Sequence, residues 1–193
     1  MAEEQPQISN NPVTLHKTIV LVGMMGAGKT AVGRTLAAQI GVDFLDSDHE
    51  IEEAANMSIA EIFERDGEPF FRQKETQVIE RLLEGTPCIL STGGGAFLAE
   101  RNREMITEKG VSIWLNADLE VLWERVRHKD TRPLLRTADP KATLAGIYEK
   151  RVPIYSLADL SVVSGGGASL DEMGRKVQRA LLDQRPDVLE QKS

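Results

Sequence analysis

The stretch GMMGAGKT, residues 23–30, decides the fold of this chain. The apolar run 18–23 before it predicts a buried strand, and residues 28–41 show the apolar spacing of a helix. The stretch follows the G-x-x-x-x-G-K-[ST] pattern, whose fixed positions are filled by Gly23, Gly28, Lys29 and Thr30. Such a loop cradles phosphates with its backbone N–H groups, while the lysine reaches phosphate oxygens and the hydroxyl ligates Mg²⁺. The stretch therefore predicts a site for nucleotide phosphates and a metal ion.

Further strands and helices alternate along the chain. Short apolar runs at 42–46, 88–92, 111–115 and 159–163 predict strands. A helical region runs from about 50 to 83, broken near NMS (56–58) and DGEP (66–69), and the last helix covers about 169–184. Strands that alternate with helices predict an α/β fold with a parallel sheet covered on both faces.

Composition limits the classes of function. The 193 residues carry a net charge of −7, which disfavours nucleic acid as a partner. Cys88 is the one cysteine, so the chain has no internal disulfide and no cysteine-rich metal site. No segment resembles a secretory signal or a membrane span. We therefore expect a cytoplasmic protein without a membrane partner, with one domain over 17–184, a flexible tail at 1–16 and a polar tail at 185–193.

Two acidic residues follow the second strand. LDSD places Asp46 and Asp48 two residues apart, and alternate residues of an extended chain face the same side. The carboxyl ends of parallel strands border the ligand crevice, so both acids can point into the site of the first loop. One could serve the metal through water and the other could bind a substrate hydroxyl. The alternative is that this sequence merely caps the next helix.

A second glycine run, STGGGA at 91–96, follows the third strand. Its glycines lack Cβ atoms, so a ligand can touch backbone N–H groups directly. Because the first loop already binds the nucleotide, this run is expected to contact the acceptor; the alternative is a tight, flexible turn. A similar run, SGGGAS at 164–169, is interpreted as a turn before the last helix.

Basic residues complete the pattern. The connection 127–140 is long, basic and proline-containing, which indicates a mobile lid, with a passive surface loop as the alternative. Arg72, Arg132 and Arg151 are candidates for binding phosphate or carboxylate groups bidentately. Each of them alone is more often an ordinary surface arginine; as a set beside the two glycine loops they gain weight, but spacing does not decide between these roles.

Several stretches together resemble the shikimate kinase family over about residues 17–184. They are GMMGAGKTAVGR, FLDSDHEIE, IAEIFERDGEPFFRQKE, STGGGA, TRPLL and RVPIY. The resemblance implies ATP-dependent phosphorylation of the 3-hydroxyl of shikimate, on the route to chorismate and the aromatic amino acids. It also implies a P-loop, nucleoside-monophosphate-kinase-like fold with a five-stranded parallel sheet, a substrate-binding helical region and a lid. One Mg²⁺ ion and a monomeric enzyme are expected on the same ground.

The resemblance also implies residue roles. Lys29, Asp48 and Arg132 would be catalytic, with Asp48 also binding ring hydroxyls and Arg132 closing over ATP. Thr30 would hold the metal directly and Asp46 through water. Glu75 would orient Arg72. The ATP-binding residues would be Gly26, Ala27, Gly28, Lys29, Thr30, Ala31, Arg125 and Arg132. The remaining substrate-binding residues would be Arg72, Gly94, Gly95 and Arg151.

Two rival interpretations stay open, and one position departs from the family. The rivals are another small-molecule kinase of the same fold, such as a gluconate kinase, and a non-catalytic binding protein. Many members of the family carry Glu where this chain has Leu157, which puts local support for Tyr155 in doubt.

Overall fold

A parallel sheet forms the centre of the computed structural model, which describes residues 12–129, 133–165 and 167–193. Within these residues, five strands pair in the order β3-β4-β2-β5-β6, and every neighbouring pair is parallel. The strands are β2 (Thr18–Val22), β3 (Phe44–Asp46), β4 (Ile89–Ser91), β5 (Gly110–Asn116) and β6 (Leu160–Val163). The predicted parallel sheet and α/β class are confirmed.

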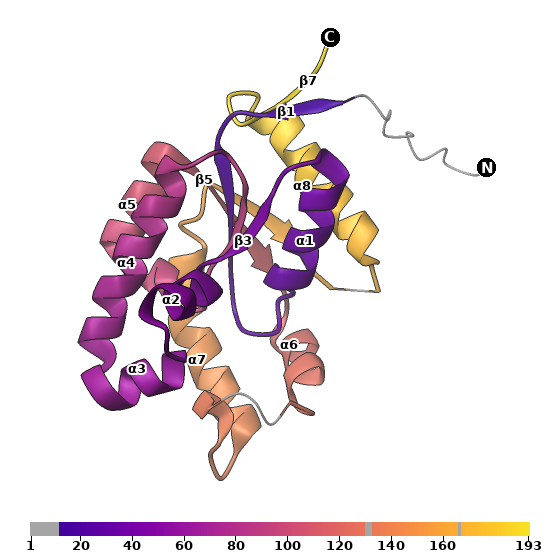
Figure 1. Cartoon of the computed structure of the whole chain (residues 1–193). Helices are drawn as coiled ribbons and strands as arrows, with labels where there is room; N and C mark the ends of the chain where they lie inside the picture. The colour runs from indigo at the N-terminus through magenta and orange to yellow at the C-terminus, as the bar shows by residue number, and fades with distance from the viewer. Residues whose placement is uncertain (1–11, 130–132, 166) are drawn as a thin grey trace, which may run out of the picture.

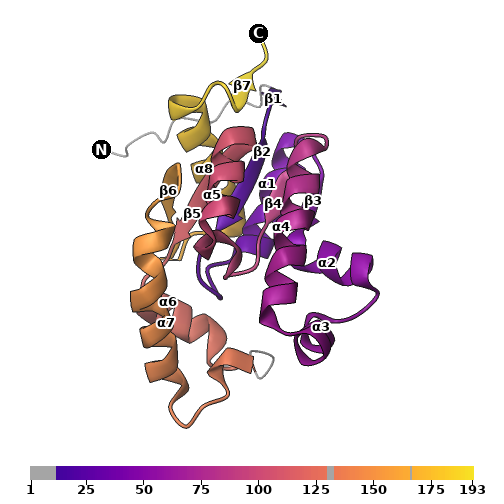
Figure 2. The ribbon, with the colours of Figure 1, turned by 90° about the vertical axis from the view of Figure 1, so that its left-hand side faces the viewer.

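Helices cover both faces of this sheet. Helices α1 and α8 lie on one face, and α4 and α5 lie on the other (Figure 1). Below the carboxyl ends of the strands, α2 and α3 lie on one side and α6 and α7 on the other (Figure 2). The helices are α1 (Lys29–Ile40), α2 (Ser47–Ala55), α3 (Ile59–Asp66), α4 (Glu68–Glu84), α5 (Glu100–Lys109), α6 (Leu119–Val126), α7 (Pro140–Tyr155) and α8 (Leu170–Gln184). Two short 3₁₀ turns, η1 (Ala96–Leu98) and η2 (Pro133–Leu135), lie between these elements.

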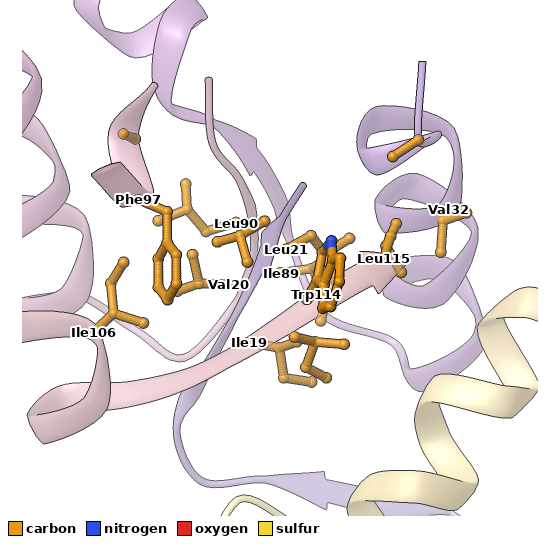
Figure 3. Packing of buried hydrophobic residues seen from close by; sticks show 14 of the residues in the cluster. Ile19, Val20, Leu21, Val32, Ile89, Leu90, Phe97, Ile106, Trp114 and Leu115 are labelled. Atoms are coloured by element: carbon orange, nitrogen blue, oxygen red, sulfur yellow. The ribbon is translucent and has the colours of Figure 1, made fainter. Parts of the chain in front are cut away.

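The central strand β2 is buried along its whole length. Its side chains alternate between the two faces, as strand geometry requires. In Figure 3, Val20 lies beside Phe97 and Ile106, whereas Ile19 and Leu21 lie toward Val32 of α1. Because both faces are covered, β2 reads as a continuous apolar run.

Local sequence signals separate the three helices between β3 and β4. Helix α2 ends at Asn56, which adopts a left-handed conformation. Ser58 and Glu61 form a reciprocal capping box at the start of α3. Pro69 lies in the first turn of α4, where its missing N–H has no helical partner to lose. The predicted breaks near 56–58 and 66–69 are confirmed.

The two ends of the domain differ from the prediction. Val13–Leu15 form β1 and Leu189–Gln191 form β7, and the two pair antiparallel. Val188 and Leu189 are fully buried, so these parts of the expected tails 1–16 and 185–193 are packed on the domain. The expectation failed here because each strand is only three residues long and its pairing joins opposite ends of the chain.

The predicted lid, 127–140, is described in part. Residues 127–129 follow α6, and η2 and the residues after it lead into α7. Arg132 lies outside the described residues. The movement of this connection and the role of Arg132 therefore stay predictions.

Candidate active site

A cavity of about 610 Å³ opens at the carboxyl ends of the strands. It brings together the loop after β2, the acids after β3 and the first glycines after β4. The predicted site residues that line it are Gly26, Ala27, Gly28, Lys29, Thr30, Ala31, Asp46, Asp48, Gly94 and Arg125. The parallel sheet thus gathers at one edge residues that lie far apart in the sequence.

The first glycine loop has the conformation that phosphate binding needs. Gly26 and Gly28 have positive φ angles of 82° and 92°, which glycine adopts without strain. Gly28 is the N-cap of α1 and contributes no side chain, so the first N–H groups of the helix border the cavity. Lys29 Nζ donates to the carbonyl oxygens of Gly23 and Met24 at 2.7 and 3.0 Å. A positive helix end and an ammonium group therefore meet in this loop.

Two further contacts brace the loop from neighbouring elements. Arg125 Nη1 donates to the carbonyl of Gly26 at 3.0 Å, so this guanidinium supports the loop while lining the cavity. Ser164 Oγ donates to the carbonyl of Ala27 at 3.1 Å. The sequence assigned only a turn to the glycine run 164–169, yet Ser164 and Ala168 line the cavity with Leu170 and Met173. This wall was missed because its residues bear no charge and no motif.

The paired acids divide between two tasks. Asp46 caps α2: its Oδ1 accepts hydrogen bonds from the backbone N–H groups of Asp48 and His49 at 2.9 and 3.2 Å. The capping alternative is therefore correct for this oxygen, and the same carboxyl also lines the cavity. Burial, with the charges of Asp46 and Glu75, raises the pKa of Asp48 to about 6, whereas Lys29 opposes the shift. The carboxyl group of Asp48 therefore has a pKa close to neutral pH, as is common for groups at functional sites.

Each glycine of the run 93–95 lies against a different charged side chain. A Cβ on Gly93 would lie 2.8 Å from Oδ1 of Asp48, and one on Gly94 would lie 3.0 Å from Nη1 of Arg151. A Cβ on Gly95 would lie 2.5 Å from both Nη atoms of Arg72. The absence of three methyl groups is therefore what lets one acid and two arginines approach a single loop.

Arg72 is held from its own helix. Its Nη1 donates to Oε1 of Glu75 at 2.9 Å, and Glu75 is 1% exposed. Burial raises the pKa of Glu75, and the guanidinium of Arg72 opposes that shift. Among the described residues, Oε2 of Glu75 has no hydrogen-bond partner. The expected Glu75–Arg72 contact is present, and it aims a guanidinium at the glycine run.

The described residues contain neither a cluster of three or more metal-ligating side chains nor a membrane-spanning helix. No group of three or more His, Cys, Asp and Glu side chains in that part of the chain is arranged to hold a metal ion. No helix there is long and apolar enough to cross a bilayer.

The fold and the site define a P-loop phosphotransferase. A family model described as shikimate kinase matches residues 25–182. A relative from Ruegeria pomeroyi, named shikimate kinase, is 69% identical over 95% of this chain and 93% of its own length. One from Cereibacter sphaeroides with the same name is 65% identical over 91% of this chain and 87% of its own. The chain belongs to the shikimate kinase family, as its motifs predict.

Solved structures agree with this assignment. Shikimate kinase from Acinetobacter baumannii in complex with shikimate has a TM-score of 0.81 and 36% identity, covering 88% of this chain and 94% of that one. A gluconokinase from Sinorhizobium meliloti has a TM-score of 0.60 and 18% identity, covering 90% of this chain and 95% of that one. At that identity the second likeness shows the shared fold alone.

Proposed function

We propose that this site transfers the γ-phosphoryl group of ATP to the 3-hydroxyl group of shikimate, giving shikimate 3-phosphate and ADP. One observation carries the proposal. The cavity that begins at the phosphate-binding loop ends at a glycine run on which an acid and two arginines converge. A donor site and a site for a small, hydroxylated carboxylate therefore share one edge of the sheet.

The donor side is built from the first loop. Gly26–Ala31 surround the phosphates with N–H groups, and Lys29 binds phosphate oxygens. Thr30 and Asp46 would hold one Mg²⁺ ion, since both line the cavity and supply the oxygen ligands that this ion prefers. The cap of α2 uses only Oδ1 of Asp46, so the other carboxylate oxygen is available for the ion. The ion supplies charge neutralisation at the phosphates when bound.

The acceptor side is built from the second glycine run and the helices beside it. Arg72 and Arg151 bind the shikimate carboxylate, because forked guanidinium groups match carboxylate oxygens. Backbone N–H groups of Gly94 and Gly95 bind a ring hydroxyl. Asp48 binds the ring hydroxyls from α2 and orients the attacking one.

The reaction needs positioning and charge neutralisation more than covalent catalysis. The 3-hydroxyl oxygen bonds to the γ-phosphorus as the bond to the ADP oxygen breaks, and Asp48 accepts the hydroxyl proton. No phosphoenzyme forms. Arg132 stabilises charge on the transferring group when the connection 127–140 closes over the nucleotide, which also limits ATP hydrolysis by water.

The enzyme acts as a monomer in the cytoplasm. A monomer is supported by the fact that the proposed donor and acceptor groups among the described residues all come from one chain. Gel filtration with light scattering tests the oligomeric state.

The experiment that tests the function is release of ADP from Mg²⁺–ATP with a panel of acceptors. The panel contains shikimate, quinate, gluconate and nucleoside monophosphates. We expect release with shikimate alone. Release with gluconate instead would move the chain to the gluconate-kinase alternative, and ATP binding without release for any acceptor would identify a non-catalytic relative.

A further inference from the structure

The peptide between Gly94 and Gly95 in the acceptor site is free to rotate unless a contact holds it. A trans peptide is planar, so its C=O and N–H groups point in opposite directions and turn together. Glycine on both sides removes the steric barriers that normally keep a peptide from rotating as a unit. Something other than local sterics must therefore fix the direction of the Gly95 N–H.

Tyr155 makes the contact that can fix it. Its hydroxyl donates to the carbonyl oxygen of Gly94 at 2.6 Å. The side chain is fully buried at the end of α7, and its ring lies 6.4 Å from that of Trp114 between centroids. Burial raises the pKa of Tyr155, with Arg151 opposing, so the phenol keeps its proton at neutral pH and remains a donor.

The same helix end contacts the run a second time. A Cβ on Gly94 would lie 3.0 Å from Nη1 of Arg151, 3.8 Å from the Tyr155 hydroxyl and 4.0 Å from the carbonyl oxygen of Gly23. The last turn of α7 therefore reaches the acceptor run where that run passes the phosphate-binding loop. Because Tyr155 is held in the core, the hydroxyl is a rigid reference point for the loop.

We propose that Tyr155 is a positioning residue for the acceptor. By holding the Gly94 carbonyl toward the core, it turns the Gly95 N–H toward the bound ring and keeps the Gly94–Gly95 peptide from flipping. The inference rests on the proposed function, since it assigns to Tyr155 the orientation of a backbone donor for a shikimate hydroxyl.

Tyr155→Phe tests it, with Tyr148→Phe as the matched control. The chain has two tyrosines, both lie on α7, and Tyr148 is partly buried against the core. Loss of one hydrogen bond should raise the KM for shikimate about three- to tenfold. The KM for ATP should stay unchanged, and calorimetric affinity for shikimate without nucleotide should fall by the same factor. Tyr148→Phe should match the wild type in all three.

Deoxy analogues separate positioning from a general loss of structure. The analogues 4-deoxyshikimate and 5-deoxyshikimate each lack one hydroxyl that does not react, and the affinity of the wild type and of Tyr155→Phe is measured for both. The penalty of Tyr155→Phe should vanish for the analogue that lacks the hydroxyl bound by Gly95 and persist for the other. Equal penalties for shikimate and both analogues would overturn the proposal, as would an unchanged affinity for shikimate.

Two controls keep the outcome interpretable. If melting of Tyr155→Phe begins near 25 °C, affinities are compared at a temperature where circular dichroism shows both proteins folded. Failure of the proposed function can be told apart from failure of the positioning role. If the proposed function is wrong, the wild type releases no ADP with shikimate. If only the positioning role is wrong, the wild type releases ADP and Tyr155→Phe does not show the expected loss of affinity.

Discussion

Asp48 shows a conflict between folding and catalysis at the scale of one residue. Burial and the charges of Asp46, Glu75 and Glu52 all favour its protonated form, and Lys29 opposes them. The proposed reaction needs the carboxylate. The folded enzyme therefore carries a destabilised charge at neutral pH, which is a common arrangement at functional sites.

Asp48→Asn should stabilise the protein at neutral pH while abolishing turnover. The pKa of Asp48 is higher in the folded state, so the wild type loses stability as pH rises from 3.8 through about 6. Asparagine removes this loss, and the gain in free energy of unfolding should be about 1–3 kcal/mol above pH 7. Urea unfolding at pH 4 and 7.5 measures it. A gain that is equal at the two pH values would contradict this origin.

Gly95→Ala should weaken the acceptor site selectively. The new methyl group would lie 2.5 Å from both Nη atoms of Arg72, and Glu75 holds that guanidinium from the other side. Arg72 must shift, so the KM for shikimate should rise at least tenfold, about the effect of losing a charged hydrogen bond. The KM for ATP should change less than twofold. Steady-state kinetics with each substrate varied decides the matter.

At the scale of elements, helix packing decides whether replacing a helical glycine by alanine raises or lowers the free energy of unfolding. Gly33 lies inside α1, where a Cβ would meet the Phe44 ring at 2.6 Å, whereas Gly146 lies inside α7 with nothing within 4 Å. Helix propensity alone favours alanine at both positions by about 1 kcal/mol. The spacing between α1 and β3 is therefore set by the missing side chain at Gly33.

Gly146→Ala should raise the free energy of unfolding by about 0.5–1 kcal/mol, and Gly33→Ala should lower it by about 1–3 kcal/mol because of overpacking. Chemical denaturation of both variants beside the wild type measures the two signs. Stabilisation by Gly33→Ala would mean that Phe44 yields at little cost.

The elements differ in how far sequence predicts them. Strand β2 and the loop after it were predictable because an apolar run and a phosphate motif are local signals. The bracing of Gly26 by Arg125 was not, since it depends on where α6 ends relative to a loop 99 residues away. The Asp46 cap left two alternatives open because the same oxygen chemistry serves a helix N-terminus and a metal ion.

At the scale of the whole molecule, the candidate active site and the pair of terminal strands lie at opposite ends of the sheet. β1 and β7 lie at one end of the sheet, and α2, α6 and α7 lie at the other (Figure 1). β1 and β7 were not predictable because their antiparallel pairing joins residues from opposite ends of the chain, with Val13 opposite Gln191 and Leu15 opposite Leu189. Propensity in a three-residue strand is weaker than such tertiary contacts.

Leu189→Ala should therefore lower stability without altering the site. Leu189 is fully buried, and loss of a buried leucine side chain usually costs about 2–5 kcal/mol. Turnover at 15 °C, where the variant stays folded, should match the wild type. Glu190→Ala, on the exposed side of the same strand, should change stability by less than about 0.5 kcal/mol. A loss of turnover in folded Leu189→Ala would mean that the two ends are coupled.

The glycine run also bears on how inhibitors of this enzyme could lose their effect. A compound that replaces the acceptor against residues 93–95 would meet main-chain atoms there, and main-chain atoms do not change by mutation. Any replacement at the three positions would place a Cβ against Asp48, Arg151 or Arg72. A mutation at residues 93–95 that weakened binding of the inhibitor would then also disturb the acceptor site of the enzyme. Mutations that confer resistance should therefore arise at other positions.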